Sequence, residues 1–416
     1  MADCFLVLPP LTRDKAVILG KNSQRPATEV QEVIYKTAKI NSDGAKVQCT
    51  YIEVDQVKKT NAVIISKPAW MWGAEMGSND QGVSVAMAPI WTKVNGPSDL
   101  EERLLGQDLT RLALERANTA RDAVVVITKL LSQYGQGGAG CEETGSQKWG
   151  HHNSFLIADK EEGWILETAR NYWVAKVIKD GFYNISTTPT IGCDFDMSSE
   201  DLVERCIKEG LYITDSGPFN FAAIFSDPQR DEGGTADRRD KGRQLLEKFT
   251  AKKEFGLVEM MEILRDQESN ICMSGPFMTT GSMISVISPI VPACHWLTAT
   301  PNPVASFFKP FIFCPNNQAG TLTSSPFYGE KNTVKLTPQE QVDRSHPLVE
   351  GHKKLLDLLE QDELQGHMIK KNLRELEQNC LEDIKEVLSQ FTEQSCVKVA
   401  AIFSHMCNIE MNFYKM

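Results

Sequence analysis

The sequence predicts an α+β fold, a four-layer α-β-β-α sandwich with a C-terminal helical extension. Strand-like apolar runs occupy the first ninety residues, two helical patterns follow, and short strands return before a long helical tail. The segment 47–54 is rich in β-forming residues on both faces, which is typical of a sheet covered on each side. Helices must therefore supply the two outer layers.

The first strands are predicted where apolar runs lie between Pro, Gly, Asn and Asp, at residues 5–8, 16–19, 47–54 and 62–65. The first helix is expected to begin at a capping box of Ser98 and Glu101. A second begins near Thr119 and ends at the glycine cluster 135–138. That cluster follows a helix and carries no Gly-Lys-Ser/Thr, so we interpret it as a helix end with a loop and not as a phosphate-binding loop.

The middle of the chain predicts an evenly spaced meander, a helix, an exposed loop and further strands. The strands are expected at 154–158, 163–167, 173–178, 283–287 and 311–314, the helix at about 199–211, and the loop at 226–240. The loop is assigned from its richness in Asp, Arg and Gly.

The chain divides into a main domain, residues 1–335, and a C-terminal helical extension, residues 336–416, where Leu, Glu, Gln and Lys take over with helical spacing. Two apolar stripes predict a helical hairpin that packs on the main domain. A coiled-coil partner surface is the alternative, but heptads are not sustained.

Composition and charge exclude several classes of function. Hydrophobic residues make up 41% and charged residues 24% of the 416 residues, which is ordinary for a globular protein, and the net charge is −11. Nucleic acids and anionic membranes require clustered Lys and Arg, so neither is expected as a partner. The sequence shows no bilayer-length apolar run and no signal-peptide pattern at its start, so we expect a soluble cytoplasmic protein without a transmembrane segment.

Cysteine and histidine spacing gives no indication of a metal or redox site. The eleven cysteines include no Cys-x-x-Cys pair, and the seven histidines include no His-Glu-x-x-His. We expect free thiols in a reducing compartment, no metal and no cofactor.

Cys4 is the candidate nucleophile. It lies directly before a predicted strand, and if short trimming made it the first residue, that residue would supply both a thiol and an amine base. The alternative is a small apolar residue that opens an edge strand, because an unpaired cysteine is usually a buried hydrophobe.

Several long and idiosyncratic strings are spread over nearly the whole chain. They include Lys21-Asn22-Ser23-Gln24-Arg25-Pro26, Cys49-Thr50-Tyr51-Ile52-Glu53, Pro68-Ala69-Trp70-Met71-Trp72-Gly73-Ala74-Glu75-Met76-Gly77, Tyr134-Gly135-Gln136-Gly137-Gly138, Trp164-Ile165-Leu166-Glu167-Thr168-Ala169 and Phe308-Lys309-Pro310-Phe311-Ile312-Phe313. Together these strings resemble the secernins. The strings 112–116 and 298–301 are most similar to the second vertebrate paralogue of that family.

Secernins belong to a dipeptidase family of N-terminal-nucleophile hydrolases, related to penicillin V acylase and bile-salt hydrolase. The resemblance implies the N-terminal-nucleophile hydrolase form of the αββα sandwich, cytoplasmic residence and hydrolysis of small peptide amides by an N-terminal cysteine. Members are associated with regulated exocytosis, so the resemblance also implies a protein partner in the secretory machinery.

The family pattern Cys-Asp-(Cys or Thr)-Phe places the nucleophile position on Ala2, with Cys4 two residues later. Cys4 is expected to serve if residues 1–3 are removed and the strand shifts by two residues, which preserves the facing of side chains. The enzyme hypothesis places Lys21, Arg25 and Asn79 around the pocket as substrate-binding residues. Their structural alternatives are a strand charge, an ion-pair partner and a turn residue.

Further departures from the family pattern favour a second hypothesis. Gln24 stands where the family has an acid, Met87 where an amide is expected to face the oxyanion, and Thr187 where relatives carry Asn. Together they indicate reduced or absent hydrolysis, with the inherited pocket acting in a binding protein of regulated exocytosis.

Overall fold

Two antiparallel sheets form the centre of the computed structural model, which describes residues 1–142, 149–227, 235–326 and 343–415. The first sheet has six strands in the order β14 (Phe182–Ile185), β1 (Ala2–Val7), β2 (Val17–Pro26), β16 (Phe277–Ile287), β17 (Cys294–Leu297) and β18 (Lys309–Ile312). The second has eight, in the order β15 (Met197–Ser198), β13 (Tyr172–Ile178), β12 (Gly163–Ala169), β11 (His152–Ala158), β10 (Ser84–Ile90), β9 (Met76–Asn79), β8 (Val63–Pro68) and β3 (Gln31–Lys36).

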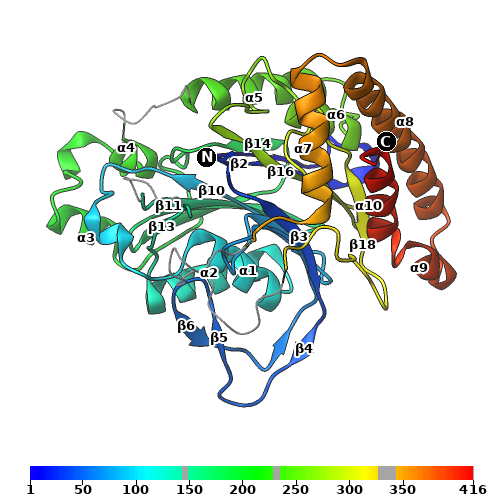
Figure 1. The fold of residues 1–416 in the computed structure, drawn as a ribbon. Helices are drawn as coiled ribbons and strands as arrows, with labels where there is room; N and C mark the ends of the chain where they lie inside the picture. Colours follow the sequence, from blue (N-terminus) through cyan, green and yellow to red (C-terminus); the bar gives the residue numbers. More distant parts are fainter. Residues whose placement is uncertain (143–148, 228–234, 327–342, 416) are drawn as a thin grey trace.

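Helices cover the outer faces of both sheets, which confirms the α+β, four-layer αββα sandwich (Figure 1). Helices α1 (Gly106–Arg116) and α2 (Ala120–Tyr134) pack on the eight-stranded sheet. Helices α5 (Thr235–Thr250) and α6 (Leu257–Leu264) cover the six-stranded sheet. Two shorter helices, α3 (Leu202–Lys208) and α4 (Phe221–Phe225), lie beside the sandwich.

The β1–β2 hairpin lies at the centre of the six-stranded sheet and carries the unusual residues. All ten residues of β2 are buried, although five consecutive ones, residues 21–25, are polar or charged. Buried polar groups must find hydrogen-bond partners, so this stretch needs partners from both neighbouring layers. Its inner face meets the eight-stranded sheet, and its outer face meets α6.

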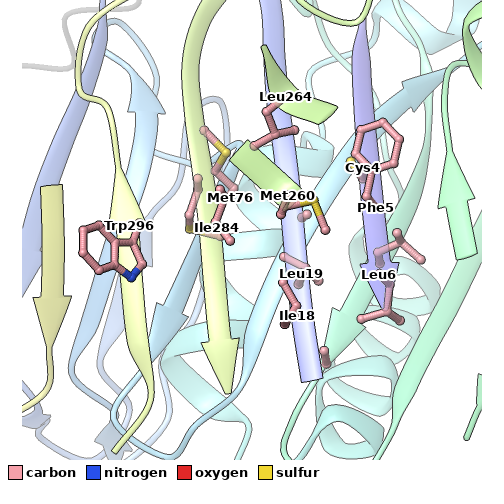
Figure 2. Close-up of a cluster of buried hydrophobic side chains, with 14 of the residues drawn as sticks. Cys4, Phe5, Leu6, Ile18, Leu19, Met76, Met260, Leu264, Ile284 and Trp296 are labelled. Carbon is pink, nitrogen blue, oxygen red and sulfur yellow. The ribbon is translucent and has the colours of Figure 1, made fainter. Parts of the chain in front are cut away.

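Apolar packing surrounds this polar stretch. Figure 2 shows Cys4, Phe5 and Leu6 on β1 beside Ile18 and Leu19 on β2, with Met260 of α6 close by. A Cβ added at Gly20 would lie 2.4 Å from the Met260 sulfur, so a larger residue there would force the Met260 side chain to move. The hairpin is therefore held within a buried and closely packed core.

Several predicted elements are confirmed. Thr119 caps α2 by accepting a hydrogen bond from the Asp122 amide, and the helix ends at Gly135, whose φ of 69° favours glycine. The meander strands appear as β11, β12 and β13, and the predicted helix at 199–211 contains α3. Local sequence patterns were sufficient to predict these elements, because the helix caps and the alternation of apolar residues agree with the burial in the structure.

Other predictions are wrong. Residues 47–54 form two short strands, β5 (Lys46–Gln48) and β6 (Glu53–Asp55), in a separate small sheet, and β4 (Lys39–Ile40) pairs with β7 (Lys59–Thr60) in another. Ser98 lies in a short 3₁₀ helix, Pro97–Leu100, whose capping carboxylate is Asp99. The predicted loop 226–240 includes the start of α5, and its residues 228–234 lie outside the described residues.

The C-terminal helices are α7 (Pro347–Glu360), α8 (Leu364–Ser389), α9 (Glu393–Val399) and α10 (Ile402–Phe413). Their apolar residues share one hydrophobic cluster with the six-stranded sheet. Helices α7 and α8 form the predicted hairpin, and the predicted boundary at residue 335 lies outside the described residues. None of the helices in the described ranges combines the length and the apolarity that crossing a membrane requires.

Candidate active site around Cys4

Cys4 lies on the inner face of β1, fully buried between the two sheets. Its thiol donates to the carbonyl oxygen of Met87 on β10, 3.7 Å away. In the antiparallel pair with β2 it stands directly opposite Lys21, so the two side chains share a face. Cys4 therefore reaches a cation without the two-residue strand shift that the sequence led us to expect.

Lys21 links the two sheets beside this thiol. Its ammonium donates to the Met87 carbonyl at 2.5 Å, to the Glu75 carboxylate at 2.7 Å and to the Glu75 carbonyl at 2.9 Å. These three acceptors use all three donors of a lysine ammonium. Lys21 is fully buried, and its partner carboxylate makes that burial tolerable.

Arg25 completes the charged cluster from the same strand, β2. Its guanidinium donates to Glu29 at 2.5 Å, to the second oxygen of Glu75 at 2.8 Å and to the Gly140 carbonyl at 2.7 Å. Gln107 of α1 also donates to Glu75, at 2.9 Å. One buried glutamate therefore holds two cations of the same strand.

The pKa values in the cluster follow from burial and charge. Burial alone would raise the pKa of Glu75, but Lys21 and Arg25 hold it well below its usual range. Burial raises the pKa of the Cys4 thiol to about 12, opposed by Lys21 and reinforced by Asp3 and Glu75. In the intact chain the thiol is therefore protonated at neutral pH.

Residues 1–3 occupy the space directly in front of Cys4. The α-amine of Met1 donates to the Gln24 carbonyl at 2.8 Å, and burial lowers its pKa to about 5. Ala2 is opposite Ser23, and Asp3 points to the outer face, where it pairs with Arg238 of α5. The nitrogen of Cys4 is a peptide nitrogen in this state and cannot act as a base.

The predicted site residues fall into two groups. Lys21 and Arg25 come together beside Cys4, where the Lys21 ammonium bonds three protein acceptors and the Arg25 guanidinium bonds three through its Nε, Nη1 and Nη2 atoms. Asn79 has other partners. Its side chain donates to the Leu114 and Ala117 carbonyls at the end of α1 and accepts from the amides of Gln81 and Val83.

The three departures from the family pattern also find places in the structure. Gln24 donates to the Asp3 carboxylate at 2.5 Å. The Met87 side chain packs among the α1 and α2 residues, so the carbonyl of this residue faces Cys4 and its side chain does not. Thr187 is buried beyond β14, and its carbonyl accepts from the Trp91 amide.

His151 contributes an unused ring nitrogen to this region. Its Nδ1 lies 2.9 Å from the His152 carbonyl, which makes Nε2 the acceptor, and no residue that the structure describes bonds that buried Nε2. Trp91 and Trp149 lie against the ring. Burial lowers the pKa of His151 to about 4, with the Met1 amine, Glu75 and Arg25 also acting on it.

This lowered pKa predicts an acid-sensitive contribution to stability. Unfolded His151 takes up a proton near pH 6.5 while the folded form stays neutral down to about pH 4, so acidification through that window favours unfolding. Between pH 7 and pH 5 the histidine should cost about 2 kcal/mol of unfolding free energy. Urea titrations should show a correspondingly smaller pH difference in His151→Gln, and an unchanged difference would contradict the assignment.

Sequence reasoning missed four of these residues. Glu75 lay inside a recognised string, but nothing local marked it as the partner of two cations. Arg238 lay in the predicted exposed loop. His151 carried no motif, and neither did Ser186, whose hydroxyl donates to the Asp3 carboxylate at 2.7 Å. Five consecutive polar residues within an otherwise apolar strand pattern at 21–25 were the signal that could have directed attention to a buried polar centre.

A family model described as peptidase family C69 matches residues 26–235, half of the chain. The chain belongs to peptidase family C69. The matched range contains Glu75 and all eight strands of the eight-stranded sheet, and it begins one residue after Arg25. The family assignment therefore covers one of the two sheets that enclose the site.

Solved structures similar to this family C69 chain include three hydrolases. The C2A mutant of conjugated bile acid hydrolase from Clostridium perfringens has 12% identity and a TM-score of 0.40, covering 71% of this chain and 88% of its own. Penicillin V acylase from Agrobacterium tumefaciens has 10% identity and a TM-score of 0.42, covering 75% and 86%. A Caenorhabditis elegans N-acylethanolamine-hydrolyzing acid amidase orthologue has 14% and 0.37, covering 68% and 92%.

Proposed function

We propose that this family C69 chain is a latent cysteine-type hydrolase of small peptide amides, with Cys4 as its nucleophile once residues 1–3 are removed. One observation carries the proposal. The Cys4 thiol and the Lys21 ammonium meet at the same Met87 carbonyl, so a buried thiol lies beside a buried cation. A neighbouring cation favours the thiolate form that attacks a carbonyl.

Removal of residues 1–3 would supply the missing base. The nitrogen of Cys4 would become an α-amine, a group whose ordinary pKa of about 8 lets it accept a proton close to neutral pH. That amine accepts the thiol proton, the thiolate attacks the amide carbon, and the protonated amine returns its proton to the leaving nitrogen. Water then hydrolyses the acyl thioester. Loss of Asp3 would also remove a charge that raises the thiol pKa.

The resemblance to the secernins, which spans nearly the whole chain, extends this proposal to a secernin-like cytoplasmic protein, nearest to the second vertebrate paralogue. The alternative function is a catalytically reduced protein that binds a secretory-machinery partner. The burial of Ala2 and Asp3, with Gln24 in place of an acid, favours that alternative for a chain that keeps these residues. The state of the N-terminus therefore separates the two functions.

Activity of a chain that begins at Cys4 tests the proposal. Released from a cleavable fusion, this chain should hydrolyse members of a dipeptide panel at least about 100-fold faster than the intact chain, because only it carries the amine base. Cys4→Ala should abolish turnover, while Cys193→Ala, which alters an exposed thiol, should not change it. Equal rates for the two chains, or turnover that survives Cys4→Ala, would overturn the assignment.

The N-terminus of the protein from its native cells gives a second measurement. Mass spectrometry should find a chain that starts at Cys4 if the hydrolase operates there. Quantitative retention of residues 1–3 would instead support the binding function.

A further inference from the structure

The Asp3 side chain occupies a recess that three different elements build. Gln24 of β2 donates to one carboxylate oxygen at 2.5 Å, and Ser186, just after β14, donates to the other at 2.7 Å. The Arg238 Nε of α5 lies 3.2 Å and 3.4 Å from the two oxygens. Each of the four residues is at most 2% exposed.

The recess is held together by bonds that do not involve Asp3. Gln24 also donates to the Ile271 carbonyl at 3.1 Å, and Arg238 also donates to the Ser186 hydroxyl at 3.3 Å. Its donors therefore keep their relative positions when the carboxylate leaves. A preformed set of donors binds a new acceptor without a further ordering cost.

One polar atom of the recess still lacks a partner. The Gln24 side-chain oxygen is buried, and no described residue bonds it. A buried acceptor without a partner costs free energy, and a ligand with an N–H or O–H group would satisfy it. The recess therefore offers three donors for a carboxylate and one acceptor for a neighbouring polar group.

The position of the recess relates it to the chemistry of Cys4. Asp3 directly precedes Cys4, whose nitrogen would become the catalytic amine. The Cα atoms of the two residues are therefore about 3.8 Å apart. In the intact strand the Asp3 carboxylate and the Cys4 thiol point to opposite faces. A chain that begins at Cys4 has no backbone in front of that nitrogen, so one ligand can reach both faces there.

We propose that this recess, formed by Gln24, Ser186 and Arg238, is a carboxylate-binding subsite that selects amide substrates with an acidic group within about one residue of the scissile bond. This rests on the proposed function, because only removal of residues 1–3 vacates the recess. The Asp3 side chain shows how a carboxylate is seated there, and in the intact chain it keeps the subsite filled.

Binding to a chain that begins at residue 4 and carries Cys4→Ser tests the subsite without any turnover. The probe is the peptide acetyl-Met-Ala-Asp, and its matched control is acetyl-Met-Ala-Asn, which has the same shape without the side-chain charge. Calorimetry should show roughly ten- to a hundred-fold tighter binding of the aspartyl peptide, because charge-assisted hydrogen bonds are the stronger ones. Equal affinities would overturn the proposal.

Variants of the recess identify the residues responsible. Arg238→Gln should remove most of the preference for the aspartyl peptide. Ser186→Ala should reduce that preference several-fold, and it provides the test if Arg238→Gln fails to fold. Arg239→Gln is the control, since its side chain lies on the same helix and pairs with Asp240. A preference that survives both recess variants would place the carboxylate elsewhere.

The result separates this inference from the proposed function. Binding selectivity without hydrolysis in the unsubstituted chain that begins at Cys4 would refute the hydrolase and retain the subsite. Hydrolysis with equal rates for aspartyl and asparaginyl dipeptides would refute the subsite and retain the hydrolase.

Discussion

Glu75→Gln is expected to lower the free energy of unfolding by about 3–5 kcal/mol, because it leaves two buried cations without their shared carboxylate. Lys21 and Arg25 contact opposite oxygens of Glu75, and the side chains of all three are at most 5% exposed. Desolvated charges are stable only when they are paired. Guanidinium titration of the intact chain at pH 7 gives the measurement.

Surface ion pairs provide the matched control. Glu53 pairs with Lys46 at 3.4 Å, and both side chains are more than half exposed. Glu53→Gln should change stability by less than about 1 kcal/mol, since exposed pairs are screened by water. Similar losses in the two variants would show that the Glu75 cluster is hydrated in solution.

The lowered pKa of Glu75 adds a pH dependence with a definite sign. Unfolded Glu75 takes up a proton near pH 4.5 while the folded carboxylate stays charged, so the wild type loses this stability as the pH falls below that value. The amide that replaces the carboxylate in Glu75→Gln does not titrate. The difference in stability between wild type and variant should therefore be full at pH 7 and should narrow below about pH 4.5.

Lys309→Met is expected to cost about 3–5 kcal/mol and to loosen the C-terminal helices first, because it strands Glu410 in the core. Lys309 on β18 and Glu410 on α10 form a 2.6 Å ion pair whose two side chains are fully buried. Tyr414 also donates to Glu410 at 2.6 Å, and His352 of α7 contacts the Tyr414 hydroxyl. The pair connects the extension to the six-stranded sheet.

A double variant distinguishes the pair from general damage to packing. Lys309→Met with Glu410→Leu replaces two buried charges by apolar groups of similar size, which is often close to neutral. It should recover most of the loss, and hydrogen exchange in α10 should return toward the wild-type rate. Additive losses in the double variant would contradict a coupled pair. Lys353→Met, at the exposed pair with Glu350, is the control.

The prediction of the fold succeeded where local pattern and burial agree. The meander β11–β13 alternates as a sheet requires, and Thr119 and Gly135 mark both ends of α2. The prediction failed where a charged segment was assumed to be exposed to solvent. Arg238 belongs to a charged segment that was assigned to a loop, but its pairing with Asp3, 235 residues away, lets α5 bury it.

The candidate site was only partly predictable for the same reason. Lys21 and Arg25 lie close to one another in a recognised string, so the sequence could place them together. Whether they can bind a substrate depends on which protein groups already pair with their charges. The carboxylate that pairs with both belongs to Glu75, which directly precedes β9 of the facing sheet. Asn79 was also predicted to bind substrate, but its side chain bonds the Leu114 carbonyl of α1 and the Val83 amide of the adjacent turn.

The sequence by itself determined the layered α+β architecture, the family to which the chain is similar and Cys4 as the thiol in question. Only the tertiary structure decided that Cys4 stands opposite Lys21, that the charges of Lys21 and Arg25 are already neutralised, and that Asp3 fills a carboxylate recess. The physical reason is that strand alternation and helix caps are local properties of the chain. The charge and burial of a site instead depend on contacts between residues that are far apart in the sequence.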